Sequence, residues 1–262
     1  MIEFFVLAWG AVIGSFLNVC IHRFPLEKSA IYPGSHCPEC EQPVRWFDNI
    51  PLVSYVLLRG KCRQCKVRIP LRYVFVEALC AAIWFFFWQR HGLSTAFAGA
   101  SILFTLLLAV TVTDLETGLI PDAFTLTGVL CGLGWAAFEP ARFGQATAIG
   151  GLARSLLGLL AGSGILWLTG FLGTLALKKD SMGLGDVKLM ALLGTFLGVK
   201  KALLVFFISP VFALPVSLFL CLRYGYAKAK EFEIPFGPYI ALAGAAMFLF
   251  GDPVSQFFGW TF

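Results

Sequence analysis

Long apolar runs, separated by short polar segments, follow one another along nearly the whole chain. Most of these runs approach the roughly 20 residues that a helix needs to cross a bilayer. The pattern therefore predicts eight membrane-spanning helices, at residues 4–21, 73–88, 94–113, 123–138, 155–176, 187–199, 202–222 and 236–250. The sixth run is short and meets the seventh at Lys200-Lys201, so it is either a half-span or one arm of a helical hairpin.

The composition agrees with this pattern. Apolar residues make up 58% of the chain and charged residues 13%, whereas a soluble domain has about 45–50% and about 25%. We therefore predict an all-α polytopic membrane protein. The net charge of +5 is modest and no basic stripe alternates with exposed aromatic residues, so we expect no nucleic acid partner. No small-residue cleavage site follows the first run, which is expected to remain as a span.

The distribution of positive charge predicts the orientation. With the N-terminus outside, fifteen of the 20 Lys and Arg residues fall in the segments assigned to the cytoplasmic side. Eight spans then place the C-terminus outside as well. Asp114 at the end of the third run and Asp186 at the start of the sixth both come to the cytoplasmic edge, where they can meet if their helices pack together.

Two features of the loops and helices complete the outline. Glycine pairs at GxxxG spacing, such as Gly10 with Gly14 and Gly194 with Gly198, are about as frequent as 27 glycines would produce by chance. We give them little weight as packing motifs.

The loop 22–72 is the one soluble piece, and with about fifty residues it needs a metal or a membrane surface to hold it.

Four cysteines in this loop form a CxxC–x21–CxxC pattern: Cys37, Cys40, Cys62 and Cys65. Two such pairs can surround one Zn²⁺ with four thiolates in a structural site. Two disulfides or a redox-active CxxC are the alternatives, but disulfides do not persist in the cytoplasm and no βαβ pattern surrounds either pair. The cysteines at 20, 80, 131 and 221 lie in separate spans and are read as apolar packing residues.

The two aspartates, Asp114 and Asp186, are candidates for an acid–base pair. Two carboxyl groups about 3 Å apart share one proton, so one can take a proton from water while the other donates to a carbonyl oxygen. Gly183 and Gly185 beside Asp186 would let a substrate backbone approach. The alternative is that Asp186 caps its helix and that Asp114 is an interfacial charge.

Other acidic residues have simpler interpretations. Asp122 follows Pro121 at a helix start, which is a good capping position, and Glu116 is read as a solvated turn residue. Glu77 lies inside the second span, where it could pair with Arg72 or Arg68, or bind a substrate amine.

Several stretches resemble the bacterial prepilin peptidase family. They are Gly14-Ser15-Phe16-Leu17-Asn18-Val19, Arg23-Phe24-Pro25, the two CxxC pairs, Asn49-Ile50-Pro51-Leu52-Val53-Ser54-Tyr55, Arg59-Gly60-Lys61-Cys62, Ile120-Pro121-Asp122, Gly183-Leu184-Gly185-Asp186-Val187-Lys188 and Pro235-Phe236-Gly237-Pro238-Tyr239. They run in order over almost the whole chain.

The resemblance implies a GxGD-type aspartic endopeptidase of the bacterial inner membrane. Such enzymes remove the basic leader of type IV prepilins or type II secretion pseudopilins at the cytoplasmic face, and many also methylate the new N-terminus with S-adenosylmethionine. By motif position Asp114 and Asp186 are the catalytic pair, with Gly183, Gly185 and Lys188 beside it. Gly60 and Lys61 match positions tied to methyl transfer, and the four cysteines match a zinc-binding tetrad.

The resemblance also suggests a division into a first helix at 1–21, a zinc-binding loop domain at 22–72 and a membrane-embedded peptidase domain at 73–262. Two other functions are weighed against it. An ion-coupled transporter would place its carboxylates near mid-bilayer and show internal repeats, and neither feature is present in the sequence. A membrane-anchored zinc-loop adaptor would leave both carboxylate motifs unexplained.

Overall fold

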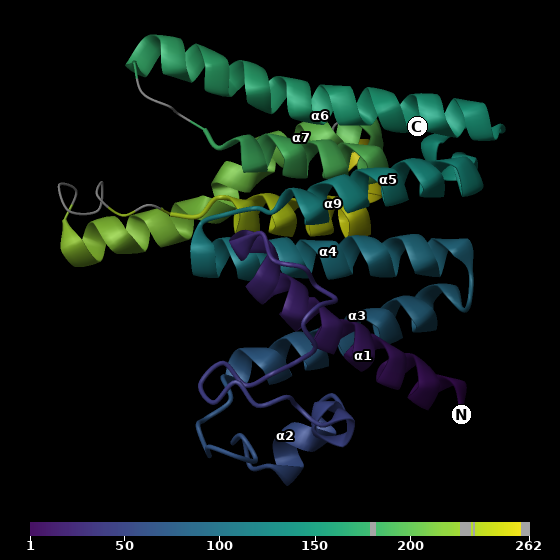
Figure 1. Ribbon diagram of the computed structural model, residues 1–262. Coiled ribbons are helices and arrows are strands. Elements are labelled where there is room, and N and C mark those ends of the chain that lie inside the picture. Colours follow the sequence, from purple (N-terminus) through teal and green to yellow (C-terminus); the bar gives the residue numbers. More distant parts are fainter. Residues whose placement is uncertain (179–181, 226–231, 233, 258–262) are drawn as a thin grey trace. The chain divides into compact units, whose positions relative to one another are not determined.

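The computed structural model describes residues 1–178, 182–225, 232 and 234–257, and this part of the chain consists of helices and connecting loops, with two isolated β-bridges and no strand. Its main helices are α1 (Ile2–Arg23), α3 (Leu71–His91), α4 (Thr95–Thr117), α5 (Asp122–Phe138), α6 (Ala148–Leu177), α7 (Leu184–Tyr224) and α9 (Gly237–Phe257) (Figure 1). Short helices are η1 (Phe24–Leu26), η2 (Trp46–Asn49), α2 (Val53–Leu57) and η3 (Pro140–Phe143).

Five helices are long and apolar enough to cross a membrane: Ile2–Leu26, Leu71–His91, Thr95–Thr117, Ala148–Ala176 and Leu184–Tyr224. The apolar segments Asp122–Phe138 and Gly237–Gly251 are shorter. The chain is thus an all-α, multi-pass membrane protein, and eight spans remain a prediction. The predicted cytoplasmic segments 177–186 and 223–235 lie partly outside the described residues, as does the C-terminus.

The sixth and seventh apolar runs form one element, α7, which spans 41 residues. Its backbone leaves the helical conformation at Gly198, where φ is +71° and ψ is 177°. Only glycine adopts this combination of angles without strain, so the helix is interrupted at Gly198 rather than at Lys200-Lys201. The length of α7, about 62 Å at 1.5 Å per residue, is enough for two passes.

Contacts between residues divide the chain into two units, Met1–Ala109 and Val110–Phe262, with the division inside α4. In the first unit α1 packs along α3 (Figure 1). A Cβ at Gly10 would lie 2.8 Å from the Cα of Ala81, and one at Gly14 would lie 2.7 Å from the Cα of Glu77. The helices therefore approach so closely because both positions are glycine.

The second unit is built around α7, which packs on α5, α6 and α9. A Cβ at Gly194 would collide with the carbonyl oxygen of Gly158 on α6, and the Ser155 hydroxyl donates to the Thr195 carbonyl oxygen at 2.8 Å. The low weight given to GxxxG spacings was therefore wrong for both quoted pairs. Their glycines are interface residues, which a count of matches cannot distinguish from chance.

Many large apolar side chains of these helices are exposed, including Leu160, Trp167 and Leu172 on α6. Such a surface is suited to contact with lipid acyl chains. Cys20 and Cys80 are buried and Cys131 and Cys221 half-buried, all four as free thiols, as expected for packing residues.

Candidate functional site

Asp114 lies near the end of α4, in the unit Val110–Phe262. The helix continues to Thr117, one turn beyond the predicted end, and stops at Gly118, whose φ of +66° is suited to a helix terminus. This extension makes Glu116 an exposed helical residue rather than a turn residue. Asp114 itself is buried, with 5% of its surface exposed.

A backbone group of α9 holds the Asp114 carboxylate. The N–H of Gly237, the first residue of α9, donates to Asp114 Oδ2 at 2.9 Å. A Cβ at Gly237 would lie 2.7 Å from the same oxygen and 3.0 Å from Cδ1 of Ile120. Only a glycine therefore allows the α9 backbone to approach the carboxylate this closely.

Asp186 lies in the first turn of α7 and reaches the same place. A Cβ at Gly185 would be 3.0 Å from Cβ of Ile120, so Ile120 packs between the start of α7 and Gly237. Ile120 and Gly237 thus connect the carboxylate of Asp114 to the first turn of α7, which carries Asp186. The structure thus brings together two aspartates that are far apart in the sequence, on the ends of two helices.

The capping alternative for Asp186 does not match this geometry. The N-cap of α7 is Gly183, with no side-chain capping hydrogen bond, and Asp186 is the third helical residue. Asp122 is likewise not the N-cap of α5, which is Pro121. Its carboxylate instead accepts a hydrogen bond from Lys188 Nζ at 2.6 Å, an exposed ion pair that joins the starts of α5 and α7.

The four loop cysteines form one cluster in the unit Met1–Ala109. The Sγ atoms of Cys37, Cys40, Cys62 and Cys65 all lie within 4.8 Å of one another, and those of Cys37 and Cys65 are 3.8 Å apart. Zn–S bonds of about 2.3 Å in a tetrahedron place two sulfurs about 3.8 Å apart. All four are free thiols, so the cluster could hold a metal ion.

Each CxxC pair is shaped by the same local turn. The N–H groups of Cys37 and Cys62 donate to the carbonyl oxygens of Gln42 and Val67, at 3.0 and 2.8 Å. The residue after each second cysteine, Glu41 or Lys66, has a positive φ of 56° or 60°. The two turns therefore present their sulfurs in equivalent ways.

The backbone around Cys62 also favours the thiolate form of this one cysteine. The backbone N–H groups of Cys65 and Gln64 donate to the Cys62 sulfur and lower the pKa of that thiol to about 7. A thiolate is the form that binds metal. The pair of turns thus provides both the distances and the donor chemistry of a Cys₄ site.

Gly60 and Lys61 lie directly before Cys62. Gly60 has a φ of +65°, and a Cβ there would be 2.8 Å from the Tyr55 hydroxyl oxygen. Lys61 lines a pocket of about 330 Å³ together with Arg59, Arg63, Lys66, Leu57, Leu58 and Cys62. Arg63 is held by Asp48 at 2.6 and 2.7 Å, and this pair keeps the pKa of Asp48 below its usual range.

Glu77 fixes the loop to the membrane helices. Its Oε2 accepts a hydrogen bond from the Leu52 N–H at 2.8 Å, and only 8% of its surface is exposed. This contact, which the sequence did not indicate, gives the buried carboxylate a structural role at the start of α2.

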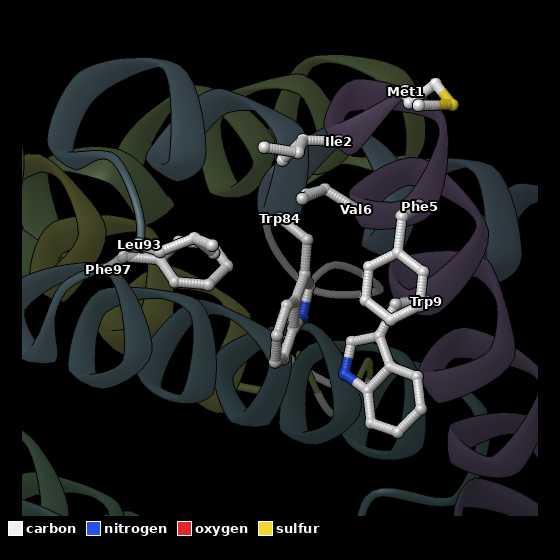
Figure 2. A pocket seen from close by; sticks show the side chains of 8 residues that line it. All are labelled: Met1, Ile2, Phe5, Val6, Trp9, Trp84, Leu93 and Phe97. Carbon is white, nitrogen blue, oxygen red and sulfur yellow. The ribbon is translucent and has the colours of Figure 1, made fainter.

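A pocket of about 430 Å³ opens beside α1, α3 and the start of α4 (Figure 2). Its lining consists of Met1, Ile2, Phe5, Val6, Trp9, Trp84, Leu93 and Phe97. None of these side chains is ionisable, so the pocket offers no side-chain acid or base for catalysis.

Comparison with known proteins decides the family. A family model described as "Type IV leader peptidase family" matches residues 101–218, and one described as "Bacterial Peptidase A24 N-terminal domain" matches residues 8–91. A "Prepilin leader peptidase/N-methyltransferase" of Neisseria gonorrhoeae is 32% identical, over 96% of this chain and 91% of that protein. The chain belongs to the type IV leader peptidase family.

Further relatives support this membership. A protein of the same name from Stutzerimonas stutzeri is 35% identical over 95% of this chain and 91% of its own length. A "Type 4 prepilin-like proteins leader peptide-processing enzyme" of Escherichia coli is 33% identical over 90% of both chains. No solved structure matches. The resemblance seen in the motifs is thus confirmed, and membership in a peptidase family argues against the transporter and the adaptor.

Two residues of the carboxylate site, Gly237 and Ile120, were not among the predicted site residues. Both belong to motifs quoted for the resemblance. A glycine between Phe236 and Pro238 at the start of an apolar run is a signal for close backbone approach, but the sequence does not say which group it approaches.

Proposed function

We propose that this protein cleaves the leader from type IV prepilins or type II secretion pseudopilins, with Asp114 and Asp186 as the catalytic pair. The relatives' names supply the substrate class. The observation that carries the assignment of residues is the convergence of the two aspartates beside Ile120 and Gly237, on helix ends within one unit.

The pair activates a water molecule. One carboxylate takes a proton from the water as its oxygen attacks the scissile carbonyl, and the other carboxyl group donates a proton to the carbonyl oxygen. The Gly237 N–H fixes the orientation of the Asp114 carboxylate, which acts directly on the reacting atoms. A Cβ at Gly183 would meet only Asp186 Oδ2, at 3.7 Å, so Gly183 is proposed to leave space beside Asp186 for the substrate backbone. Gly185 does not serve this role as predicted, because Ile120 occupies the space beside it.

The site is proposed to lie at the cytoplasmic face of the bacterial inner membrane, with both termini outside. A basic leader would then remain in the cytosol while the apolar helix that follows it enters the bilayer. Both aspartates sit near helix ends, and this supports a scissile bond at the boundary between water and lipid. The proposed domains are the first helix at 1–21, the zinc loop at 22–72 and the peptidase domain at 73–262.

The cysteine cluster is proposed to bind one structural Zn²⁺. Its four sulfurs lie within 4.8 Å of one another, near the spacing of about 3.8 Å in a tetrahedral zinc site, and the loop that they join is too small to be held by a core of its own. The zinc would supply no step of peptide cleavage.

The protein is also proposed to methylate the new N-terminus, an activity that the relatives' names include. S-adenosylmethionine would be the methyl donor, with Gly60 and Lys61 contributing to this activity. The pocket beside Lys61 is lined by four cationic side chains, which do not suit the positively charged sulfonium and ammonium groups of this donor. The donor is therefore not assigned to that pocket.

Cleavage of a purified prepilin tests the assignment. Asp114→Asn and Asp186→Asn are each expected to lower the cleavage rate by about 10²- to 10⁴-fold, while the variants insert normally. Asp122→Asn is the matched control, since it removes a carboxylate of the same segment that lies outside the pair. Normal cleavage by either of the first two variants would remove that residue from the catalytic site. Mass measurement of the product with S-adenosylmethionine present tests the methylation.

A further inference from the structure

The loop between α1 and α3 exposes a group of apolar side chains. Trp46 of η2 is 81% exposed, and on α2 Val53, Val56 and Leu57 are 52%, 74% and 74% exposed. The two short helices pack together. A soluble piece of this size rarely leaves such a set uncovered, so this surface requires a partner.

A hydrogen bond fixes the level of this surface relative to the membrane helices. The N-cap residue of α2, Leu52, donates its N–H to Glu77 at 2.8 Å. Glu77 lies six residues into α3, which is about 9 Å from its first residue Leu71. Because α3 has 21 residues, its length of about 31 Å only just spans the hydrocarbon layer. The start of α2 is therefore held about 9 Å inside the level at which α3 begins, a depth typical of a helix that lies in the membrane interface.

Positive charge lies beside the same surface. The segment 22–72 carries nine Lys and Arg against four Asp and Glu, a surplus equal to the net charge of the whole chain. Beside α2, the pocket of about 330 Å³ combines Leu57 with the exposed Arg59 and Lys66. An apolar wall next to cationic groups is complementary to a phospholipid whose headgroup is anionic.

We propose that η2 and α2 form an interfacial anchor that binds anionic phospholipids of the leaflet from which α3 starts. Trp46, Val56 and Leu57 insert among the upper acyl chains, and Arg59 and Lys66 contact the phosphate groups. Because the loop is attached to α1 and α3, this surface always stays near the membrane. Weak individual contacts are therefore sufficient for lipid binding. The inference goes beyond the proposed function and requires neither of its activities.

Depth-dependent fluorescence quenching tests the apolar part. The full-length protein is placed in nanodiscs that contain lipids brominated near the headgroup, and the signal of Trp46 is obtained by difference from Trp46→Phe. Trp46 is expected to be strongly quenched. Val56→Glu/Leu57→Glu is expected to lose at least half of this quenching, whereas Val56→Ile/Leu57→Met keeps it. An unquenched Trp46, or equal quenching in the Glu variant, would overturn the proposal.

Comparison of two lipid mixtures tests the charged part. Quenching of Trp46 is expected to be greater in phosphatidylcholine with one quarter phosphatidylglycerol than in phosphatidylcholine alone. Arg59→Gln/Lys66→Gln is expected to abolish this difference, and Lys28→Gln, which removes an exposed charge elsewhere in the loop, to preserve it. Equal quenching of the wild type in both mixtures would overturn anionic lipid as the partner. So would an unchanged difference in the double Gln variant.

Discussion

The carboxylate site and the cysteine cluster are built in opposite ways. Asp114, Asp186 and Gly237 come from three separate helices and are brought together only by packing. The four cysteines come from two similar local turns within one loop, each closed by its own backbone hydrogen bonds. The first site therefore depends on backbone positions set by packing between helices, and the second on two local turns that the proposed metal would join.

This difference determines how each site should respond to small changes. A shift of one helix by a fraction of an ångström misplaces a carboxylate in the first site. In the second site, the turns are already formed locally, and the proposed ion would set their relative position. The predictions below separate these two kinds of dependence.

Among the changes that separate the two sites, the largest effect is expected from Gly237→Ala. The new Cβ would lie 2.7 Å from Asp114 Oδ2, so the start of α9 or the carboxylate must move. A misplacement of this kind is expected to slow prepilin cleavage by about 10²-fold, with zinc content unchanged. The control is Gly134→Ala on α5, where a Cβ meets nothing within 4 Å. A Gly237→Ala enzyme with wild-type rates would show that the contact with Asp114 does not orient the carboxylate.

A complementary result is expected from Cys37→Ser/Cys62→Ser. Loss of one thiolate from each turn should abolish binding of the single zinc and make the loop more susceptible to trypsin, because the two turns are no longer joined. Prepilin cleavage should persist. Metal content and proteolysis of the purified protein measure both effects, with Cys131→Ser as a control that retains zinc. Unchanged zinc in the double variant would reject the assignment of these ligands.

The smallest effect is expected from the ion pair between Asp122 and Lys188. Both side chains are more than 40% exposed, so the pair contributes at most about 1 kcal/mol. Asp122→Lys or Lys188→Asp alone should reduce cleavage by no more than about fivefold. The exchanged double variant should recover the wild-type rate. At high salt, the difference in cleavage rate between each single variant and the wild type should become smaller. Failure of the exchange to restore activity would mean that Lys188 has a role other than joining α5 to α7.

The sequence predicted what depends on local pattern. Apolar runs located the helices, and the CxxC spacing located the cysteine cluster, because both signals lie within short stretches. It did not locate the break in α7 at Gly198, where the short sixth run and the adjacent lysines suggested position 200. It also gave no weight to Gly10 and Gly14, since a close helix contact depends on the facing residue in another helix.

The carboxylate site lies between these cases. Motif resemblance and the order of the predicted spans indicated Asp114 and Asp186, but the sequence did not predict which groups bind them. The Gly237 N–H is a backbone donor, so the sequence does not show that it binds the Asp114 carboxylate. It also does not show that Ile120 packs between Gly185 and Gly237. The interpretation of Asp122 as a helix cap was wrong, because its side chain forms an ion pair with Lys188.

The central claim is that Asp114 and Asp186 act as one catalytic unit, and a double-mutant comparison tests it most directly. Prepilin cleavage is measured for Asp114→Asn, Asp186→Asn and the variant with both changes. If the two carboxyl groups work on the same water and carbonyl, the double variant should be no slower than either single variant. Losses that multiply in the double variant would show two independent contributions and contradict the account.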